Sequence, residues 1–204
     1  MSSTNDGDPR VLRSRAALIR SATELLDSAS PTPSVTEVVA RAGTSRPTFY
    51  QHFGDLPALY RAAARERLQA VFAPVEVPSP LDPKWNEAVG AALEGILGRL
   101  REHQVFFTQL LQGPAGIDVL EDAVDFSTER LVTVSPHASV SAGAIPESTG
   151  RFLAAGAIWL TREWLLAADP EPARDLAYRI NGLLAAGVVV KRDPATLNSP
   201  EGQK

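Results

Sequence analysis

Apolar residues recur every three or four positions through most of this 204-residue chain. That spacing is typical of amphipathic helices, and no strand pattern or internal repeat competes with it. Glycines, prolines and short polar stretches interrupt the pattern at intervals. The sequence therefore predicts an all-α protein of about nine helices, at residues 9–28, 34–41, 45–51, 55–72, 84–102, 103–111, 117–134, 147–167 and 172–190.

The longest interruptions predict how the chain is divided. Residues 1–9 are small and polar, and we expect a disordered N-terminal tail there. Four prolines lie between residues 73 and 83, where they prevent a continuous helix and predict a linker. Residues 193–204 have no apolar face and predict a C-terminal tail. Two helical domains remain, at residues 10–72 and 84–192.

Residues 34–53 predict two short helices joined by a tight turn. Ser34 and Glu37 have the spacing of a capping box, which begins a helix. Gly43 supplies a turn residue that tolerates unusual backbone angles. Ser45 can begin the second helix, with Pro47 in the first turn, where a missing N–H does least harm. Such a pair is a helix-turn-helix, whose second helix enters the DNA major groove.

The same stretch, SVTEVVARAGTSRPTFYQHF, resembles the DNA-binding signature of the TetR/AcrR family of bacterial transcriptional regulators. One residue departs from the pattern: Leu56 stands where the family usually has a lysine that contacts a phosphate. The resemblance implies an N-terminal three-helix DNA-binding domain with a linking fourth helix at residues 10–72. It also implies a C-terminal helical domain for ligand binding and dimerisation at residues 84–192. The matching residues are Thr36, Val38, Val39, Ala40, Ala42, Gly43, Ser45, Thr48, Phe49, Tyr50, His52, Phe53 and Leu59.

Side chains of this stretch have the chemistry needed to read DNA. Arg46 can form two hydrogen bonds with a guanine edge, and Thr48 can offer a methyl or a hydroxyl group to a base. The ring of Pro47 can contact a thymine methyl. By resemblance, Tyr50 and His52 correspond to the phosphate-contacting aromatic residue and histidine of the family. Thr36 and Ser45 carry hydroxyls near helix N-termini, where phosphates bind. The predicted DNA-binding residues are Thr36, Ser45, Arg46, Pro47, Thr48, Tyr50 and His52.

These residues also have structural alternatives. Tyr50 could be a boundary aromatic, His52 a surface histidine and Arg46 a solvated charge. Phe49 and Phe53 are expected in the core instead of on DNA. A two-turn recognition helix makes few base contacts, so specific binding usually requires two half-sites. We therefore expect a homodimer on a palindromic operator.

Charge is distributed unevenly along the chain. The net charge is −4, yet residues 10–72 carry nine arginines against five acidic residues. Residues 73–204 carry eleven basic and seventeen acidic residues. A basic first domain and an acidic second one favour a DNA-binding domain attached to an effector domain, with chance asymmetry as the alternative.

The last two helices resemble the dimer module of the family. Large anchors and a run of small residues in residues 152–164 would let another helix approach closely, and two helices from each subunit would form a four-helix interface. Packing of this face inside one chain is the alternative. The predicted interface residues are Phe152, Ala155, Trp159, Leu176, Ile180, Leu183, Leu184 and Val188.

The second domain also contains aromatic and polar residues that could line a small-molecule pocket. Each of them could equally be a core or surface residue. No cofactor is expected; the three histidines are scattered, and the chain has no cysteine, so no metal site is expected either. The predicted pocket residues are Trp85, His103, Phe106, Phe107, Leu110, Phe126, Arg130 and Trp159.

These observations favour a transcriptional repressor that binds its operator as a homodimer and is released by an unknown small-molecule effector. The alternative is a helical adaptor or ligand-binding protein of the same fold without specific DNA binding. An enzyme is not expected, because no phosphate-binding loop, nucleophile elbow or dinucleotide fingerprint is present. We expect a cytoplasmic protein with no membrane partner, since no apolar run is long enough to cross a bilayer.

Overall fold

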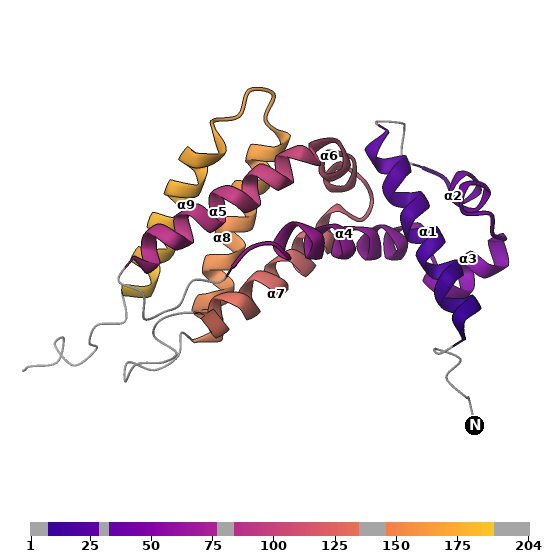
Figure 1. Cartoon of the computed structure of the whole chain (residues 1–204), viewed down its shortest axis with the longest axis horizontal. Coiled ribbons are helices and arrows are strands. Elements are labelled where there is room, and N and C mark those ends of the chain that lie inside the picture. Colours follow the sequence, from indigo (N-terminus) through magenta and orange to yellow (C-terminus); the bar gives the residue numbers. More distant parts are fainter. Residues whose placement is uncertain (1–7, 29–32, 77–83, 135–145, 190–204) are drawn as a thin grey trace, which may run out of the picture.

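A computed structural model describes residues 8–28, 33–76, 84–134 and 146–189. Most of both predicted tails, residues 77–83 of the predicted linker and the side chain of Val188 lie outside the described residues. The described residues form nine helices and no strand (Figure 1). The helices are α1 (Pro9–Asp27), α2 (Val35–Ala42), α3 (Arg46–Phe53), α4 (Leu56–Phe72), α5 (Trp85–Glu102), α6 (Gln104–Gln112), α7 (Gly116–Val134), α8 (Glu147–Leu166) and α9 (Ala173–Val189).

The all-α prediction is confirmed, and each helix begins and ends within two residues of its predicted position. Among the described residues, no helix is both long enough and apolar enough to cross a membrane. The helix starts follow local signals: Asp8, Ser34, Ser45 and Asp55 each accept a hydrogen bond from a backbone N–H in the first turn. Such caps satisfy amide groups that a helix start leaves without a partner.

Helices α1 to α4, which we call the head, pack around one apolar centre. The side chains of Ile19, Val38, Phe49 and Leu59 are almost completely buried there. Tyr60 is buried beside them, and its hydroxyl donates to the carbonyl of Pro33 at 2.6 Å. Burial of a side chain of this size stabilises the fold by about 1.5–3 kcal/mol. The packed centre fixes the position of α3 relative to α1 and α4.

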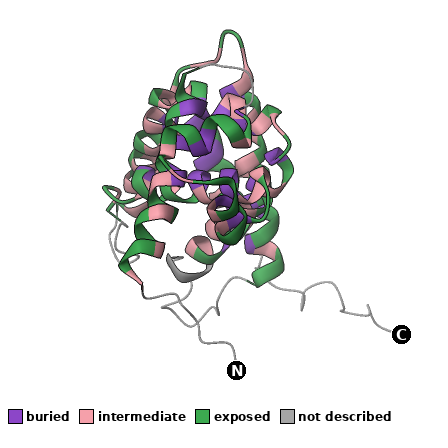
Figure 2. Ribbon diagram, turned by 90° about the vertical axis from the view of Figure 1, so that its right-hand side faces the viewer, coloured by how far each residue is buried: buried purple, intermediate pink, exposed green. Residues whose placement is uncertain are grey.

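Helices α5 to α9, which we call the body, form a bundle at the other end of α4 (Figure 1). In it α7 packs against α8, and α5 packs against α9. Buried residues line the inside of the bundle, and its outer surface is mostly exposed (Figure 2). Leu176 and Ile180 of α9 are buried in this core.

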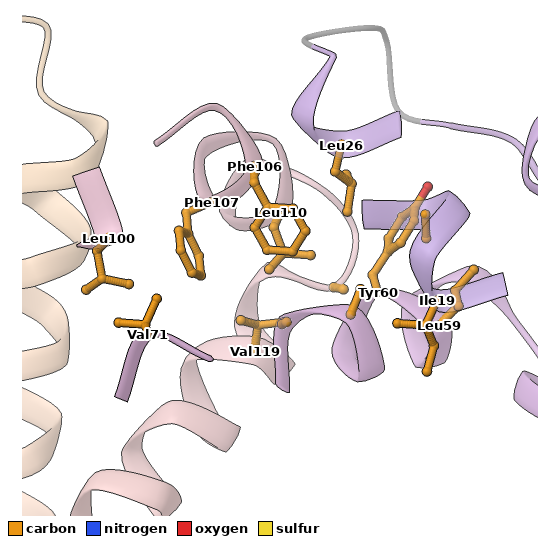
Figure 3. Packing of buried hydrophobic residues seen from close by; sticks show 14 of the residues in the cluster. Ile19, Leu26, Leu59, Tyr60, Val71, Leu100, Phe106, Phe107, Leu110 and Val119 are labelled. Atoms are coloured by element: carbon orange, nitrogen blue, oxygen red, sulfur yellow. The ribbon is translucent and has the colours of Figure 1, made fainter. Parts of the chain in front are cut away.

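The apolar core continues from the head into the body. Leu26 of α1 lies close to Phe106 and Leu110 of α6, and Val71 of α4 faces the body side (Figure 3). All four side chains are buried within one cluster. A movement of the head relative to the body must therefore disturb packed side chains, which resist continuous deformation.

Candidate nucleic-acid interface

The start of α2 and the turn between α2 and α3 have the local structure that the sequence predicts. The Ser34 hydroxyl accepts from the Glu37 N–H at 3.3 Å, and the Glu37 carboxylate accepts from the Ser34 N–H at 2.8 Å. The Ser34 hydroxyl also donates to the Glu37 carboxylate at 2.7 Å, and this bond together with the Ser34 N–H lowers the pKa of Glu37 below its usual value. Gly43 then has φ of +62°, a left-handed conformation that side chains with a Cβ rarely adopt. The predicted capping box and glycine turn are confirmed.

Helix α3 turns one side to the core and another to solvent. Phe49 and Phe53 are buried, as predicted. Arg46, Pro47 and Tyr50 are exposed, and 55% of Tyr50 is accessible. An exposed aromatic on a helix with a buried opposite side is a candidate contact surface. This surface lies at the end of the molecule farthest from the body (Figure 1).

The other predicted DNA-binding residues lie around the same surface. Thr36 and Ser45 are exposed near the N-termini of α2 and α3, and Thr48 is half-buried. The hydroxyls of Ser45 and Thr48 lie 2.9 Å apart, and the Ser45 hydroxyl also accepts from the Thr48 N–H. We call the surface formed by Thr36, Ser45, Arg46, Pro47, Thr48 and Tyr50 the reading face.

Two links that hold the reading face were not predicted. Nη2 of Arg46 donates to the hydroxyl of Thr36 at 2.6 Å and joins the starts of α3 and α2. Nε2 of His52 lies 2.8 Å from the hydroxyl of Ser14 on α1. Because the single Ser14 proton is donated to the Val11 carbonyl, the serine oxygen accepts from Nε2–H of His52. His52 therefore anchors the end of α3 to α1. Sequence reasoning missed this role because Ser14 lies 38 positions away, and tertiary packing alone makes the two residues partners.

Helix α1, which packs against α2 and α3, carries four exposed arginines. Arg10, Arg13, Arg15 and Arg20 all lie on α1 with exposed side chains. Arg41 of α2 forms an ion pair with Glu24 of α1 at 3.2 Å, which indicates a structural role for Arg41. Basic side chains beside a candidate recognition helix provide the long-range attraction that DNA binding requires.

Comparisons with known proteins bear on this arrangement. No family model matches the sequence, and no curated protein matches it. Similar solved structures include a TetR-family transcriptional regulator from Streptomyces coelicolor, at 23% identity and TM-score 0.58 over 86% of this chain and 83% of that one. The chain has the TetR fold. Another similar structure is the TetR family repressor AlkX from Dietzia, implicated in n-alkane biodegradation, at 20% identity and TM-score 0.58 over 85% and 97%. A third is the dihydroxyacetone kinase operon activator DhaS, at 18% identity and TM-score 0.57 over 87% and 97%.

Within this TetR fold, the predicted ligand-pocket residues do not form one lining. Phe106, Phe107 and Leu110 are buried in the core that joins head and body. Trp159 is half exposed on α8, and its indole N–H donates to Glu163 at 3.1 Å. Three of these side chains are closely packed and the fourth faces outward, so a pocket that they share stays a prediction.

The remaining pocket candidates lie at separate places in the body. Phe126 meets the ring of Phe72 edge-on, and the Arg130 guanidinium lies over Phe126 at 4.7 Å. His103 shares a hydrogen bond of 2.7 Å with Arg67 of α4. Trp85 is half-buried at the start of α5, and its Nε1 is buried without a partner among the described residues. In the part of the chain that the structure describes, no cluster of His, Asp and Glu side chains could hold a metal ion.

The predicted dimer residues separate into two groups. Phe152, Ala155, Trp159 and Leu183 are exposed, whereas Leu184 is half-buried. Leu176 and Ile180 are buried within the single chain. Tyr178, which is not among the predicted residues, is 79% exposed. Helix α9 has two apolar stripes, and helical spacing alone does not show which one packs on α5.

Proposed function

We propose that this chain is a TetR-like transcriptional repressor that binds a palindromic operator as a homodimer and is released by a small-molecule effector. In this proposal residues 10–72 read DNA, and residues 84–192 hold the effector and the dimer surface. The observation that carries it is the reading face, where exposed Arg46, Pro47 and Tyr50 stand on a short helix that Phe49 and Phe53 anchor in the core.

The reading face has the chemistry that a major groove requires. Arg46 lies at the first position of α3, and residues near the N-terminus of a recognition helix are those that meet base edges. Its guanidinium has five N–H donors, so the bond to Thr36 leaves others for a guanine. Tyr50 can donate its hydroxyl to a phosphate and hold the helix in register.

An exposed apolar surface on α8 and α9 supports the homodimer. Phe152 is 77% exposed, and Trp159, Tyr178 and Leu183 are also exposed large apolar residues. Isolated exposed apolar residues are ordinary, but several large ones on two adjacent helices mark an association site. Small exposed residues would let a partner helix approach; they are Ala155, Gly156, Gly182 and Ala186. We call the exposed side chains of Phe152, Trp159, Tyr178 and Leu183 the α8–α9 patch.

Release by an effector requires a link between body and head, and the candidates are the ion pair of Arg61 with Asp122 and the hydrogen bond between Arg67 and His103. Arg61 of α4 donates to both carboxylate oxygens of Asp122 of α7, at 2.9 and 2.7 Å. Arg67 of α4 donates to Asp27 of α1 and lies beside His103. An effector that favours one arrangement of these contacts would change operator affinity, and a coupling of about 1–3 kcal/mol gives a 5–150-fold response.

The direction of control needs its own experiment, because AlkX is named a repressor and DhaS an activator. A promoter–reporter assay must establish whether this chain represses or activates.

The proposal is tested by selecting bound duplexes from a random DNA pool with the purified chain. We expect a palindromic consensus that is lost with Tyr50→Ala and kept with Gln112→Ala, an exposed residue at the end of α6 in the body. Tyr50→Phe removes the hydroxyl alone, so it separates the contribution of the hydroxyl to DNA binding from that of the ring. Absence of enrichment at low salt, with the wild-type fold intact, would overturn DNA reading and favour an adaptor.

A further inference from the structure

A surface cleft runs along α4 on the head, and its lining residues come from α1, α3 and α4. Its volume is about 370 Å³. Residues at intervals of three and four on α4 form one wall, and Arg15 of α1 and Phe53 of α3 close one end. The polar groups that face it are Arg15, Arg61, Arg65, Glu66 and Gln69. Three guanidinium groups thus share one concave surface with a single acidic residue.

Two of these guanidinium groups are poorly neutralised. Arg15 lies over the ring of Phe53, with 5.3 Å between guanidinium and ring centre, and forms no ion pair among the described residues. Arg65 is 67% exposed and lies 3.9 Å from Asp122, at the limit of an ion pair. Arg61 uses two donors on Asp122. Asp122, Asp118 and Glu121 of α7 act on Arg61, so the positive charge open to a ligand is that of Arg15 and Arg65.

We propose that this cleft binds a small oxyanion, a carboxylate or a phosphate, between Arg15 and Arg65. Guanidinium groups bind both anions through paired N–H···O bonds, and Phe53 holds Arg15 in place from one side. Gln69 can donate its amide N–H to the same anion. The cleft extends along α4 as far as Gln69, whereas the reading face lies on α2 and α3. We therefore assign the cleft to a free anion, and the DNA measurements below test the alternative that it holds a DNA phosphate.

Binding at this place would act on the contact between head and body. Arg61 lines the cleft and also joins α4 to Asp122 of α7. An anion in the cleft competes with Asp122 for Arg61 and Arg65, which weakens the connection of α4 with α7. Since α4 carries the head, the anion changes the position of the reading face; this last step rests on the proposed function.

The test is calorimetric titration of citrate and inorganic phosphate into the full chain without DNA, at constant ionic strength. We expect saturable binding that is about tenfold weaker with Arg15→Gln or Arg65→Gln, the usual effect of losing one charge-assisted hydrogen bond. Arg20→Gln removes the same charge from an exposed site on α1 outside the cleft and should leave binding unchanged. Absence of binding, or an equal loss with Arg20→Gln, would overturn the site.

Two further variants test the competition with Asp122. Asp122→Asn should bind the anion more tightly than wild type, because it frees Arg61 and Arg65. Glu121→Gln removes a neighbouring charge of α7 without removing the ion pair, so it should have a smaller effect. Equal effects of the two variants would show diffuse electrostatics and overturn the competition.

DNA measurements separate this inference from the proposed function. If Arg65→Gln lowers the salt dependence of operator binding by about one released counterion, the cleft holds a DNA phosphate and the free-anion site is wrong. Duplex selection without citrate binding would refute the cleft alone. Citrate binding without duplex selection would leave the anion site standing and refute the regulator.

Discussion

Nη2 of Arg46 donates to the hydroxyl of Thr36 at 2.6 Å, and this bond joins the first turn of α3 to the first turn of α2. Both residues are exposed. The bond restricts the rotamers of a long side chain before DNA arrives, which lowers the entropy lost on binding. It also means that Thr36 can act through Arg46 as well as through a phosphate.

Removal of the two partners should therefore have different effects. Arg46→Ala should weaken operator binding by about 1–3 kcal/mol and relax the base preference at one position of each half-site. Thr36→Val removes the acceptor at similar volume and should weaken binding by less, with the preference kept. Competition binding against duplexes changed at each position measures both effects. An unchanged base preference with Arg46→Ala would show that the arginine does not read bases.

The raised pKa of Tyr60 predicts a loss of folding stability at alkaline pH. Burial raises its pKa to about 12, and nearby Glu37 acts in the same direction. Because the folded pKa is above the ordinary value of about 10, this stabilisation is complete below pH 10 and disappears as pH rises through 12. Each pKa unit corresponds to about 1.4 kcal/mol of unfolding free energy.

The measurement compares thermal unfolding of wild type and Tyr60→Phe from pH 7 to 12. The variant loses the bond to the Pro33 carbonyl and should be less stable by about 1 kcal/mol at pH 7. Its disadvantage should shrink above pH 10, because it has no phenol to ionise. Parallel curves for the two proteins across this range would refute the assigned ionisation.

Most of the fold could be predicted because its signals are local. Ser34, Gly43, Ser45 and Asp55 act within four residues of their own positions, and they set the limits of α2, α3 and α4. The resemblance to the family placed Phe49 in the core, and this side chain is completely buried. Propensity, capping and turn chemistry agree in this part of the chain, which is typical of well-specified folds.

The links between helices could not be predicted in the same way. Ser14 and His52 are 38 positions apart, and their contact depends on how α1 crosses α3. Leu176 and Tyr178 lie on the same helix, yet one packs on the core and the other is exposed. Periodicity identifies an apolar stripe, but only tertiary packing decides which partner covers it.

Arg67 should contribute more to stability than an exposed arginine with a similar partner. Its side chain is 12% exposed, donates to Asp27 at 2.7 Å and lies over the Phe106 ring at 4.5 Å. Arg67→Ala should lower the free energy of unfolding by about 2–4 kcal/mol, because it leaves a carboxylate and a packed aromatic without their partner.

The matched control is Arg151→Ala, whose ion pair with Asp125 has both side chains more than half exposed. We expect a change of about 1 kcal/mol or less there, since water screens exposed pairs. Arg67→Lys should recover little of the lost stability, because an ammonium group cannot reproduce the planar contacts with the Asp27 carboxylate and the Phe106 ring. Urea unfolding measures all three variants, and equal losses for Arg67→Ala and Arg151→Ala would refute the special role of Arg67.

The α8–α9 patch predicts that assembly can be disrupted without loss of the fold. Phe152→Glu places a charge on a residue that is 77% exposed, so the single chain should keep its helix content and unfolding temperature. A charge at the centre of an apolar interface has no partner in the dimer, and its desolvation should convert dimers to monomers. Sedimentation velocity at several concentrations measures the change in mass.

Leu176→Ala is the control from the other stripe of α9. Leu176 is completely buried, so its truncation should lower stability by about 2–5 kcal/mol while folded molecules keep the wild-type mass. The two variants thus separate association from folding. A wild-type chain that sediments as a monomer at all concentrations, or a Phe152→Glu variant of unchanged dimer mass, would exclude the α8–α9 patch as the interface. Binding to a palindromic operator would then require that a different surface of the chain joins the two subunits.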